Sequence, residues 1–269
     1  MAGVDLLILG GSGLLGAELV AAAEAAGLDW VASHRTTDRA GERWRRVDLT
    51  DPDAVDALLA ETQPAAIVNA AYVQRGDELW ALTAELPGRL AAWTAGRARL
   101  VQLSTDVVFG GEKGAPYTED DPLDPAHEYG AAKAQAEAFV AEADPDAVLV
   151  RTSLMWSRLG DGGPQVALVR NPEVRFFVDE FRNPVHAASV AAACLELVGR
   201  SDISGPLHVA GPERVDRLTF ARALAPLAGV DPSTLQGGTG ADQPGRPADV
   251  SLDSSLAASL LDTEIVGLP

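Results

Sequence analysis

The stretch VDLLILGGSGLLGAELV, residues 4–20, decides the architecture expected for the chain. It opens with an aliphatic run typical of a buried strand and then turns abruptly at glycines. Gly11, Gly13 and Gly16 fit the spacing G-x-G-x-x-G, and Gly10 in place of Gly11 gives the related G-x-x-G-x-x-G. A segment rich in alanine and leucine follows. The pattern therefore predicts a strand, a tight loop and a helix in direct succession.

Glycines at these positions have a specific physical use. One permits the tight turn, another lets the backbone approach a pyrophosphate, and the last lets the helix pack close to the strand. The helix then presents free N–H groups and the positive end of its dipole to an anion. We therefore predict a dinucleotide site at this loop. Its expected members are Gly10, Ser12, Gly13, Leu14, Leu15 and Gly16.

The first two-thirds of the chain alternate between strand-like and helix-like segments. Strands are expected over Val4–Leu9, Asp29–Ser33, Ala65–Ala70, Leu100–Ser104 and Ala147–Arg151, with a third strand ending near Val47–Thr50. Helices are expected over Leu14–Ala26, Asp53–Glu61, Asp77–Ala95 and His127–Ala143. This alternation predicts an α/β protein, a Rossmann-type doubly wound parallel sheet with helices on both faces.

The regularity loosens after Thr152, and a smaller C-terminal lobe is expected there. Residues 1–152 should form the dinucleotide-binding domain, and residues 153–269 mainly a substrate-binding lobe with segments that return to the first domain. The later strands are expected over Val174–Val178 and Pro206–Val209, the helices over Ala187–Val198, Thr219–Leu227 and Ser251–Leu261, and exposed loops over Gly160–Pro164 and Gly237–Pro247.

The composition excludes several classes of binding partner. The net charge of −18 repels phosphate backbones and anionic lipids, so we expect neither nucleic acid nor a membrane as a partner. No apolar run approaches the roughly 18 residues of a membrane span. Cys194 is the only cysteine, so no intrachain disulfide can form, which favours the cytoplasm. The histidines lack metal-ligand spacing, and no metal is expected: His34, His127, His186 and His208.

The end of the second predicted strand indicates which dinucleotide is preferred. NAD sites usually carry an acid there to bond the ribose hydroxyls, but this strand ends in Ser33-His34-Arg35. Arg35 can pair with a 2′-phosphate, and Arg39 can assist, so we predict NADP(H). The alternative is that Arg35 is a solvated surface residue. Asp48 can accept a bond from the adenine amine or cap the next helix, and both roles stay open.

Tyr129 and Lys133 are four residues apart on a predicted helix and share one face. A phenol with a pKa of about 10 is a poor acid or base, and a neighbouring ammonium lowers that pKa. The pair therefore suits the interconversion of a carbonyl and an alcohol. Thr105 follows a predicted strand, at the edge where open α/β sheets bind ligands. Its hydroxyl can bond a carbonyl oxygen or cap the strand locally, and Asp106 can be a structural cap.

Several motifs together resemble the extended short-chain dehydrogenase/reductases, most closely the dTDP-4-dehydrorhamnose reductase branch. They are Gly10–Gly16, Asn69-Ala70-Ala71, Ser104-Thr105-Asp106-Val107-Val108-Phe109-Gly110, Pro116-Tyr117-Thr118-Glu119 and Tyr129-Gly130-Ala131-Ala132-Lys133. Later echoes are Val150-Arg151-Thr152-Ser153, Val178–Pro184, His208-Val209-Ala210-Gly211 and Arg246-Pro247. The resemblance covers nearly the whole chain and is most specific up to Lys133.

This resemblance implies an NADPH-dependent reductase that delivers a hydride to a 4-keto sugar on a nucleotide carrier. Tyr129 would protonate the oxygen, Lys133 would tune Tyr129 and hold the cofactor ribose, and Thr105 would polarise the carbonyl. A sugar nucleotide is the implied small-molecule partner, and the sequence leaves room for a homodimer. The residues implied beside the cofactor are the six of the glycine loop with Arg35, Asp48, Leu49, Ala70, Ala71, Tyr72, Tyr129 and Lys133.

The departures from the family pattern all fall on the substrate side. Val107 stands where family members commonly have a tyrosine. Leu154 follows Arg151-Thr152-Ser153, where the family often has an aromatic residue, and Val185 stands where threonine is usual. The sugar therefore stays open. Two alternatives also remain: an NADP-binding regulatory subunit like that of methionine adenosyltransferase, without turnover, and a sugar-nucleotide epimerase or dehydratase. The dehydratases typically have Ser-Thr-Asp-Glu at this strand end. In this chain Val107 follows Asp106, so the second acid is missing.

Overall fold

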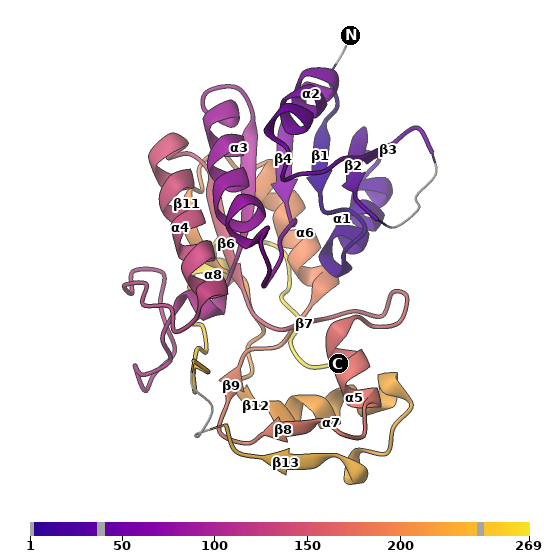
Figure 1. The fold of residues 1–269 in the computed structure, drawn as a ribbon, viewed down its shortest axis with the longest axis vertical. Helices are drawn as coiled ribbons and strands as arrows, with labels where there is room; N and C mark the ends of the chain where they lie inside the picture. The colour runs from indigo at the N-terminus through magenta and orange to yellow at the C-terminus, as the bar shows by residue number, and fades with distance from the viewer. Residues whose placement is uncertain (1–2, 37–40, 241–244) are drawn as a thin grey trace.

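The computed structural model describes residues 3–36, 41–240 and 245–269. Its central sheet has seven parallel strands in the order β11-β6-β5-β4-β1-β2-β3 (Figure 1). They are β1 (Leu6–Leu9), β2 (Trp30–His34), β3 (Trp44–Arg46), β4 (Ala66–Asn69), β5 (Arg99–Thr105), β6 (Val148–Thr152) and β11 (Gly205–His208). The chain starts in the middle of the sheet and winds outward in both directions. The predicted fold class, a doubly wound parallel sheet, is confirmed.

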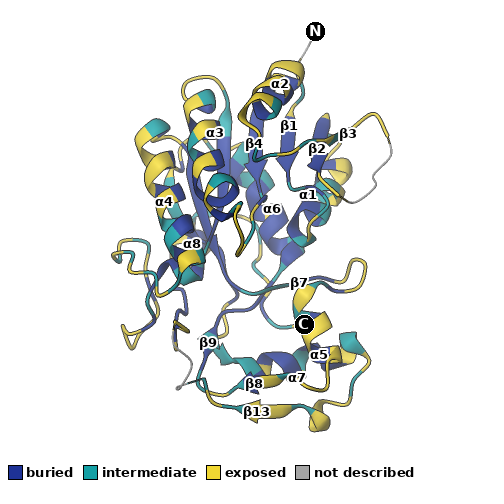
Figure 2. Cartoon of the chain, in the orientation of Figure 1, coloured by how far each residue is buried: buried dark blue, intermediate teal, exposed yellow. Residues whose placement is uncertain are grey.

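Helices cover both faces of this sheet, as the predicted alternation requires. On one face lie α1 (Leu14–Ala25) and α6 (Ala187–Val198), and on the other α2 (Pro52–Thr62), α3 (Leu86–Thr94) and α4 (Glu128–Ala143). In β1, Leu6 and Ile8 pack with the first group and Leu7 and Leu9 with the second. Because both faces are covered, the inner strands β1 and β4 are buried along their whole length, and their sequences are almost continuously apolar (Figure 2).

The elements after β6 build a smaller lobe below the sheet (Figure 1). There α5 (Pro164–Arg170) packs on α7 (Arg217–Ala228) around a core that includes Phe176 and Phe220. Three two-stranded sheets complete the lobe: β7 (Met155–Trp156) with β10 (Val185–His186), β8 (Arg175–Phe177) with β13 (Gln236–Gly238), and β9 (Phe181–Arg182) with β12 (Val215–Asp216). The chain returns to the main layer at α6 and β11, beside which α8 (Ser255–Leu260) lies.

Two predicted helices differ from the structure. In place of a continuous helix over Asp77–Ala95, a π-helical turn at Ala81–Glu85 leads into α3. Pro87 in the first turn of α3 has no N–H to donate to the carbonyl four residues earlier, so a regular α-helix cannot run through this point. The helix predicted over Ser251–Leu261 shrinks to α8, because Ser251 and its neighbours bond to the backbone of Tyr117 instead.

Two predicted loops differ as well. The loop predicted over Gly160–Pro164 ends in a helix that was not predicted, α5, which begins at Pro164. The loop predicted over Gly237–Pro247 starts inside β13, which pairs with β8. A Cβ on Gly237 would come within 3.1 Å of a Leu218 methyl group, so this glycine permits close packing on α7. Among the described residues, no helix combines the length and apolarity needed to cross a bilayer.

Candidate active site

The glycine loop between β1 and α1 has the backbone that its motif predicts. Gly10 has φ of +80°, a conformation that side chains with a Cβ rarely adopt. Its N–H donates to Ser33 Oγ at 3.0 Å, which fixes the loop to β2. A Cβ on Gly16 would clash with the carbonyl oxygen of Gly10, so only glycine lets α1 start this close to β1. A Cβ on Gly13 would meet only that oxygen, at 3.3 Å, so the site beside Gly13 is open.

The start of α1 fits a pyrophosphate. Gly13 is its N-cap and provides no side-chain cap, and the first turn of this fully described helix has no acidic residue. Uncapped N–H groups and the helix dipole both favour an anion at such a position. The open face at Gly13 and the bare helix start therefore fit the dinucleotide predicted from the motif.

The strand end next to this loop carries the predicted selectivity residues. Arg35, just after β2, bonds through Nη1 and Nη2 to both carboxylate oxygens of Glu78, at 2.5 and 2.6 Å. Glu78 raises the pKa of Arg35, and sequence reasoning did not identify this partner. Arg39 lies outside the described residues.

Asp48 and Leu49 lie on the turn that leads into α2. Asp48 Oδ1 accepts bonds from the N–H and the hydroxyl of Thr50, at 3.0 and 2.7 Å, and these bonds lower the pKa of Asp48. The cap of α2 is Asp51, which accepts from Asp53 N–H, so the capping alternative for Asp48 is wrong. Leu49 packs against the core on the α2 face, and the adenine contact of Asp48 stays a prediction.

Ala70, Ala71 and Tyr72 follow β4 and line the same edge of the sheet. A Cβ on Gly10 would come within 2.9 Å of the backbone of Ala71, so the glycine loop and this segment pack tightly together. Tyr72 is 44% exposed, and its ring centre lies 5.8 Å from that of Tyr129. The Nζ of Lys133 lies 5.5 Å from the same Tyr72 ring. Tyr72 therefore joins the cofactor side of the site to the predicted catalytic pair.

Thr105, Tyr129 and Lys133 come together at the carboxyl end of β5. Thr105 is the last residue of this strand, and its side chain lies near enough to Tyr129, in the first turn of α4, to affect the pKa of that phenol. One helical turn later, Lys133 is buried and its Nζ donates to the carbonyl oxygen of Leu103, at 2.9 Å. The structure thus brings the three predicted catalytic residues into one place.

Burial determines the protonation of this pair. It raises the pKa of Tyr129 well above 10.0, with Tyr72 and Asp106 adding to the effect and Thr105 opposing it. The net shift is therefore opposite to the lowering expected from Lys133, because burial dominates and the ammonium bonds to a backbone carbonyl. Burial also lowers the pKa of Lys133 to about 8. At neutral pH Tyr129 is a neutral phenol, which suits a proton donor.

Asp106 ties the sheet to the lobe. It accepts bonds from Ser153 Oγ at 2.6 Å and from Thr105 Oγ1 at 3.1 Å, and its Oδ2 lies 3.7 Å from Nε of Arg182 on β9. Burial raises its pKa, while the charge of Arg182 opposes that shift. Thr105, and not Asp106, caps the short helical turn after β5, so the capping role considered for Asp106 is wrong. Asp106 instead connects the end of β5 to Ser153 and Arg182 of the lobe.

Three arginines gather on Glu180, a feature that sequence reasoning missed. Arg182 and Arg217 lie 3.3 and 3.4 Å from its Oε1, and Arg246 lies 2.5 Å from its Oε2. Three positive charges thus face two carboxylates, those of Glu180 and Asp106, one of which has a raised pKa. In a chain of net charge −18, this cluster is a local positive site.

The arginine cluster lies beside the catalytic pair. Arg182 and Arg246 both lower the pKa of His127, after the larger effect of burial, and the His127 ring stacks with that of Tyr129 at 6.2 Å. Arg182 and Arg246 belonged to the quoted motifs, but nothing in the sequence singled out Arg217, which reaches the site from the first turn of α7.

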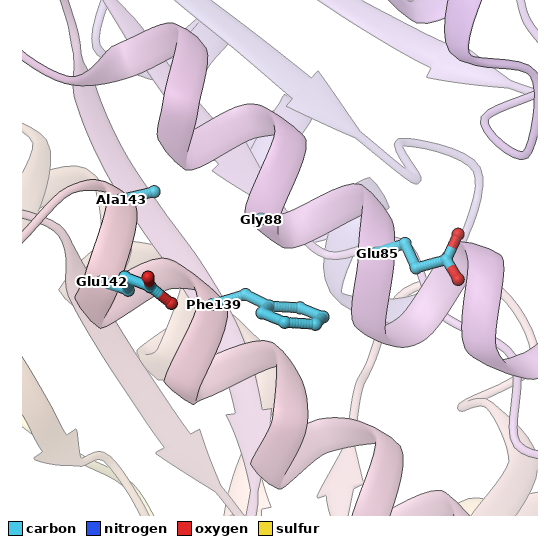
Figure 3. Close-up of a pocket in the computed structure, with 5 residues that line it drawn as sticks. All are labelled: Glu85, Gly88, Phe139, Glu142 and Ala143. Atoms are coloured by element: carbon cyan, nitrogen blue, oxygen red, sulfur yellow. The ribbon is translucent and has the colours of Figure 1, made fainter.

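A surface hollow elsewhere does not offer comparable chemistry. It has a volume of about 520 Å³ and lies between α3 and α4, lined by Glu85, Gly88, Phe139, Glu142 and Ala143 (Figure 3). In this view the Phe139 ring points toward α3 and the two carboxylates lie apart. In the part of the chain that the structure describes, no group of three or more His, Cys, Asp and Glu side chains could hold a metal ion.

Comparison with known proteins assigns the family. The model of the RmlD substrate binding domain matches residues 4–267. The chain belongs to the RmlD substrate-binding-domain family. The dTDP-4-dehydrorhamnose reductase of Mycobacterium tuberculosis is 32% identical over 270 residues, which cover 94% of this chain and 84% of that protein. The branch recognised from the sequence motifs is confirmed.

Two further proteins are similar to this chain over nearly its whole length. The methionine adenosyltransferase 2 subunit beta of Rattus norvegicus is 29% identical over 95% of this chain and 82% of that protein. The crystal structure of a dTDP-4-dehydrorhamnose reductase from Bacillus anthracis, in complex with NADP, superposes with a TM-score of 0.82 at 19% identity, covering 99% of this chain and 96% of that one. At that identity the superposition supports the fold alone.

Proposed function

We propose that this protein is an NADPH-dependent reductase of a 4-keto sugar nucleotide, similar to dTDP-4-dehydrorhamnose reductase. One observation carries the proposal: Thr105, Tyr129 and Lys133 meet at the carboxyl end of β5, between the glycine loop and the arginine cluster. We assign residues 1–152 to NADPH binding and residues 153–269 mainly to substrate binding, with α6 and β11 serving the first domain.

The chain offers the cofactor a continuous edge of the sheet. Gly10, Ser12, Gly13, Leu14, Leu15 and Gly16 would hold the pyrophosphate, Arg35, Asp48 and Leu49 the adenosine end, and Ala70, Ala71, Tyr72, Tyr129 and Lys133 the nicotinamide end. NADPH bound there supplies the hydride for the carbonyl carbon. Each of these residues lies on the β1 to β5 side of the sheet or at the start of α4.

The protein's own groups manage the proton. Tyr129, kept neutral by burial, donates its phenolic proton to the carbonyl oxygen as that oxygen becomes an alcohol. The Thr105 hydroxyl holds the same oxygen next to Tyr129. Lys133, with a pKa of about 8, is mostly charged at neutral pH and stabilises the phenolate that remains.

The arginines suit an anionic carrier. A nucleoside diphosphate sugar brings a diphosphate, which guanidinium groups bind with paired hydrogen bonds. Arg217 and Arg246 reach Glu180 from α7 and from the segment before Pro247, so they can turn from this carboxylate to a diphosphate at the lobe boundary. The positive cluster thereby explains how a strongly acidic protein accepts a negatively charged substrate.

The direct test is oxidation of NADPH with a panel of 4-keto-6-deoxy sugar nucleotides, followed by absorbance. Tyr129→Phe should lower turnover by at least about 100-fold and leave the Kd of NADPH within about twofold of wild type, because only the transferable proton is removed. A Tyr129→Phe variant that keeps most of its activity would show that another group donates the proton.

A regulatory role is the second candidate, because the relative from Rattus norvegicus is named as a subunit of another enzyme. Tight NADPH binding without turnover on any sugar nucleotide would favour that role. A homodimer and a cytoplasmic location stay predictions.

The exposed Phe139 between α3 and α4 is a candidate dimer contact, to be checked by light scattering of the wild type and Phe139→Ser (Figure 3).

A further inference from the structure

The residue expected to receive the cofactor 2′-phosphate is already held by a carboxylate. Arg35 and Glu78 form an end-on pair through two bonds of 2.5 and 2.6 Å, and both side chains are about half-exposed, at 46% and 41%. We propose that Glu78 is a cofactor-specificity residue, whose carboxylate opposes the 2′-phosphate and so sets the preference between NADPH and NADH. This inference rests on the proposed cofactor site.

The pair spans the place where the adenosine ribose should lie. Arg35 follows β2 and Glu78 follows β4, and β1 lies between these two strands in the sheet. The glycine loop begins at the end of β1. In doubly wound sheets a dinucleotide held by that loop places its adenosine ribose over the adjoining end of β2. Glu78 lies in the segment between β4 and the π-helical turn, and its bonds to Arg35 bring its carboxylate beside this expected ribose position.

Local charges determine what this position favours. Arg35 lies within electrostatic range of two carboxylates, Glu78 and Asp48, and both raise its pKa. Arg46, whose Nε donates to the backbone carbonyl of Arg35 at 3.2 Å, adds a second guanidinium. Among the described residues, two acids thus offset two arginines here, which weakens the attraction of the position for a phosphate of charge about −1.5 to −2.

Glu78 opposes the 2′-phosphate without closing the site. Its two bonds use Nη1 and Nη2 of Arg35, so the Nε–H edge of the guanidinium stays outside the pair. A phosphate on that edge would stand within several ångströms of the carboxylate and be repelled by it. NADH carries a hydroxyl there instead, and a carboxylate accepts a hydrogen bond from a ribose hydroxyl, as the acid of an NAD site does.

Nothing near Arg35 in the sequence reveals this acid, because 43 positions separate the two residues. The order of the strands, together with the connecting segment after β4, brings them together. The chain therefore has both an arginine typical of an NADP site, just after β2, and a carboxylate with the chemistry of an NAD site, in the segment that follows β4. On this basis the preference of the wild type for NADPH over NADH should be smaller than Arg35 alone would give.

The test compares the dissociation constants of NADPH and NADH, measured by fluorescence titration, for the wild type and Glu78→Gln. Removing one charge should tighten NADPH by about threefold to tenfold, since a phosphate and a carboxylate a few ångströms apart repel weakly in screened water. NADH should bind equally or up to about threefold more weakly. In Glu78→Gln, 2′,5′-ADP should displace bound NADPH at a lower concentration than in the wild type, whereas 5′-AMP should not. This comparison attributes the change in affinity to the 2′-phosphate.

Glu61→Gln is the matched control. Glu61 forms a comparable exposed pair with Arg45, at the end of α2 and away from the carboxyl edge of the strands, so its neutralisation should leave both constants unchanged. Glu78→Ala should reproduce the effect of Glu78→Gln, and 0.5 M salt should reduce it, both because the cause is charge.

The possible outcomes separate this inference from the proposed function. Equal shifts of the NADPH and NADH constants in Glu78→Gln, or no shift in either, would overturn the role of Glu78 while the wild type still binds and oxidises NADPH. A wild type that binds neither cofactor would overturn the proposed function and this inference with it. A change in the ratio of the two constants, absent in Glu61→Gln, supports the specificity role.

Discussion

Replacing Lys133 with methionine should abolish turnover and yet make the protein more stable. Lys133 is buried, and among the described residues its ammonium donates to the carbonyl of Leu103, lies 5.5 Å from the Tyr72 ring centre and has a favourable charge interaction with Glu137. Burial nevertheless dominates and lowers its pKa from 10.5 to about 8. Below pH 8 the folded protein therefore keeps a charged group in a place that disfavours charge, as expected of a residue retained for chemistry.

The magnitude follows from the pKa shift. A fall from 10.5 to about 8 corresponds to roughly 3 kcal/mol of unfavourable free energy for the charged form in the folded state. Methionine removes that cost but also removes the bond to Leu103, worth about 1–2 kcal/mol for a charged donor. The net gain is about 1–2 kcal/mol, or a rise in Tm of about 2–4 °C for a chain of this length.

The gain should depend on pH. Between pH 8 and 10.5 the unfolded wild type still binds a proton at Lys133 and the folded protein does not, so wild-type stability rises with pH through this range. The methionine variant has no such group. The difference in Tm between the two proteins should therefore narrow as pH is raised from 7 to 10.

Scanning calorimetry at several pH values measures both effects, alongside the NADPH oxidation assay. Lys113→Met is the control, since Lys113 is partly exposed and ion-paired with Asp121, and its loss should not raise Tm. A Lys133→Met variant that melts several degrees below the wild type, or whose Tm difference does not change with pH, would refute the burial argument.

Three other outcomes are expected. Gly16→Ala should weaken NADPH binding by at least about tenfold and lower Tm, because the added methyl clashes with the Gly10 carbonyl and displaces the loop; unchanged titrations would contradict this. Arg217→Ala should raise the KM for the sugar nucleotide by about tenfold or more with no change in the Kd of NADPH, since it removes one charge from the group around Glu180; an effect on NADPH alone would place it elsewhere. Cys194, whose pKa burial raises to about 12, should not react with a disulfide reagent at pH 8 until the chain is unfolded, when one thiol should titrate.

Local pattern was enough for much of the fold. The glycine spacing predicted the first strand, loop and helix, because each constraint acts within a few residues of the chain. Asp51 and Pro52 marked the start of α2, and the four-residue spacing of Tyr129 and Lys133 placed them on one helix face. Predictions failed where the determinant was distant, as at Gly237, whose packing on Leu218 makes a strand of an expected loop.

The sequence by itself therefore determined the fold class, the glycine loop and the identity of the three residues that meet at the end of β5. Only the tertiary structure decided the electrostatics of the site. Strand order brings Glu78 to Arg35, and the lobe brings three arginines to Glu180. Burial, which depends on every element packed around a group, raises the pKa of Tyr129 where its neighbour Lys133 alone predicted a fall. Charge and desolvation act through space, so their balance cannot be read from spacing along the chain.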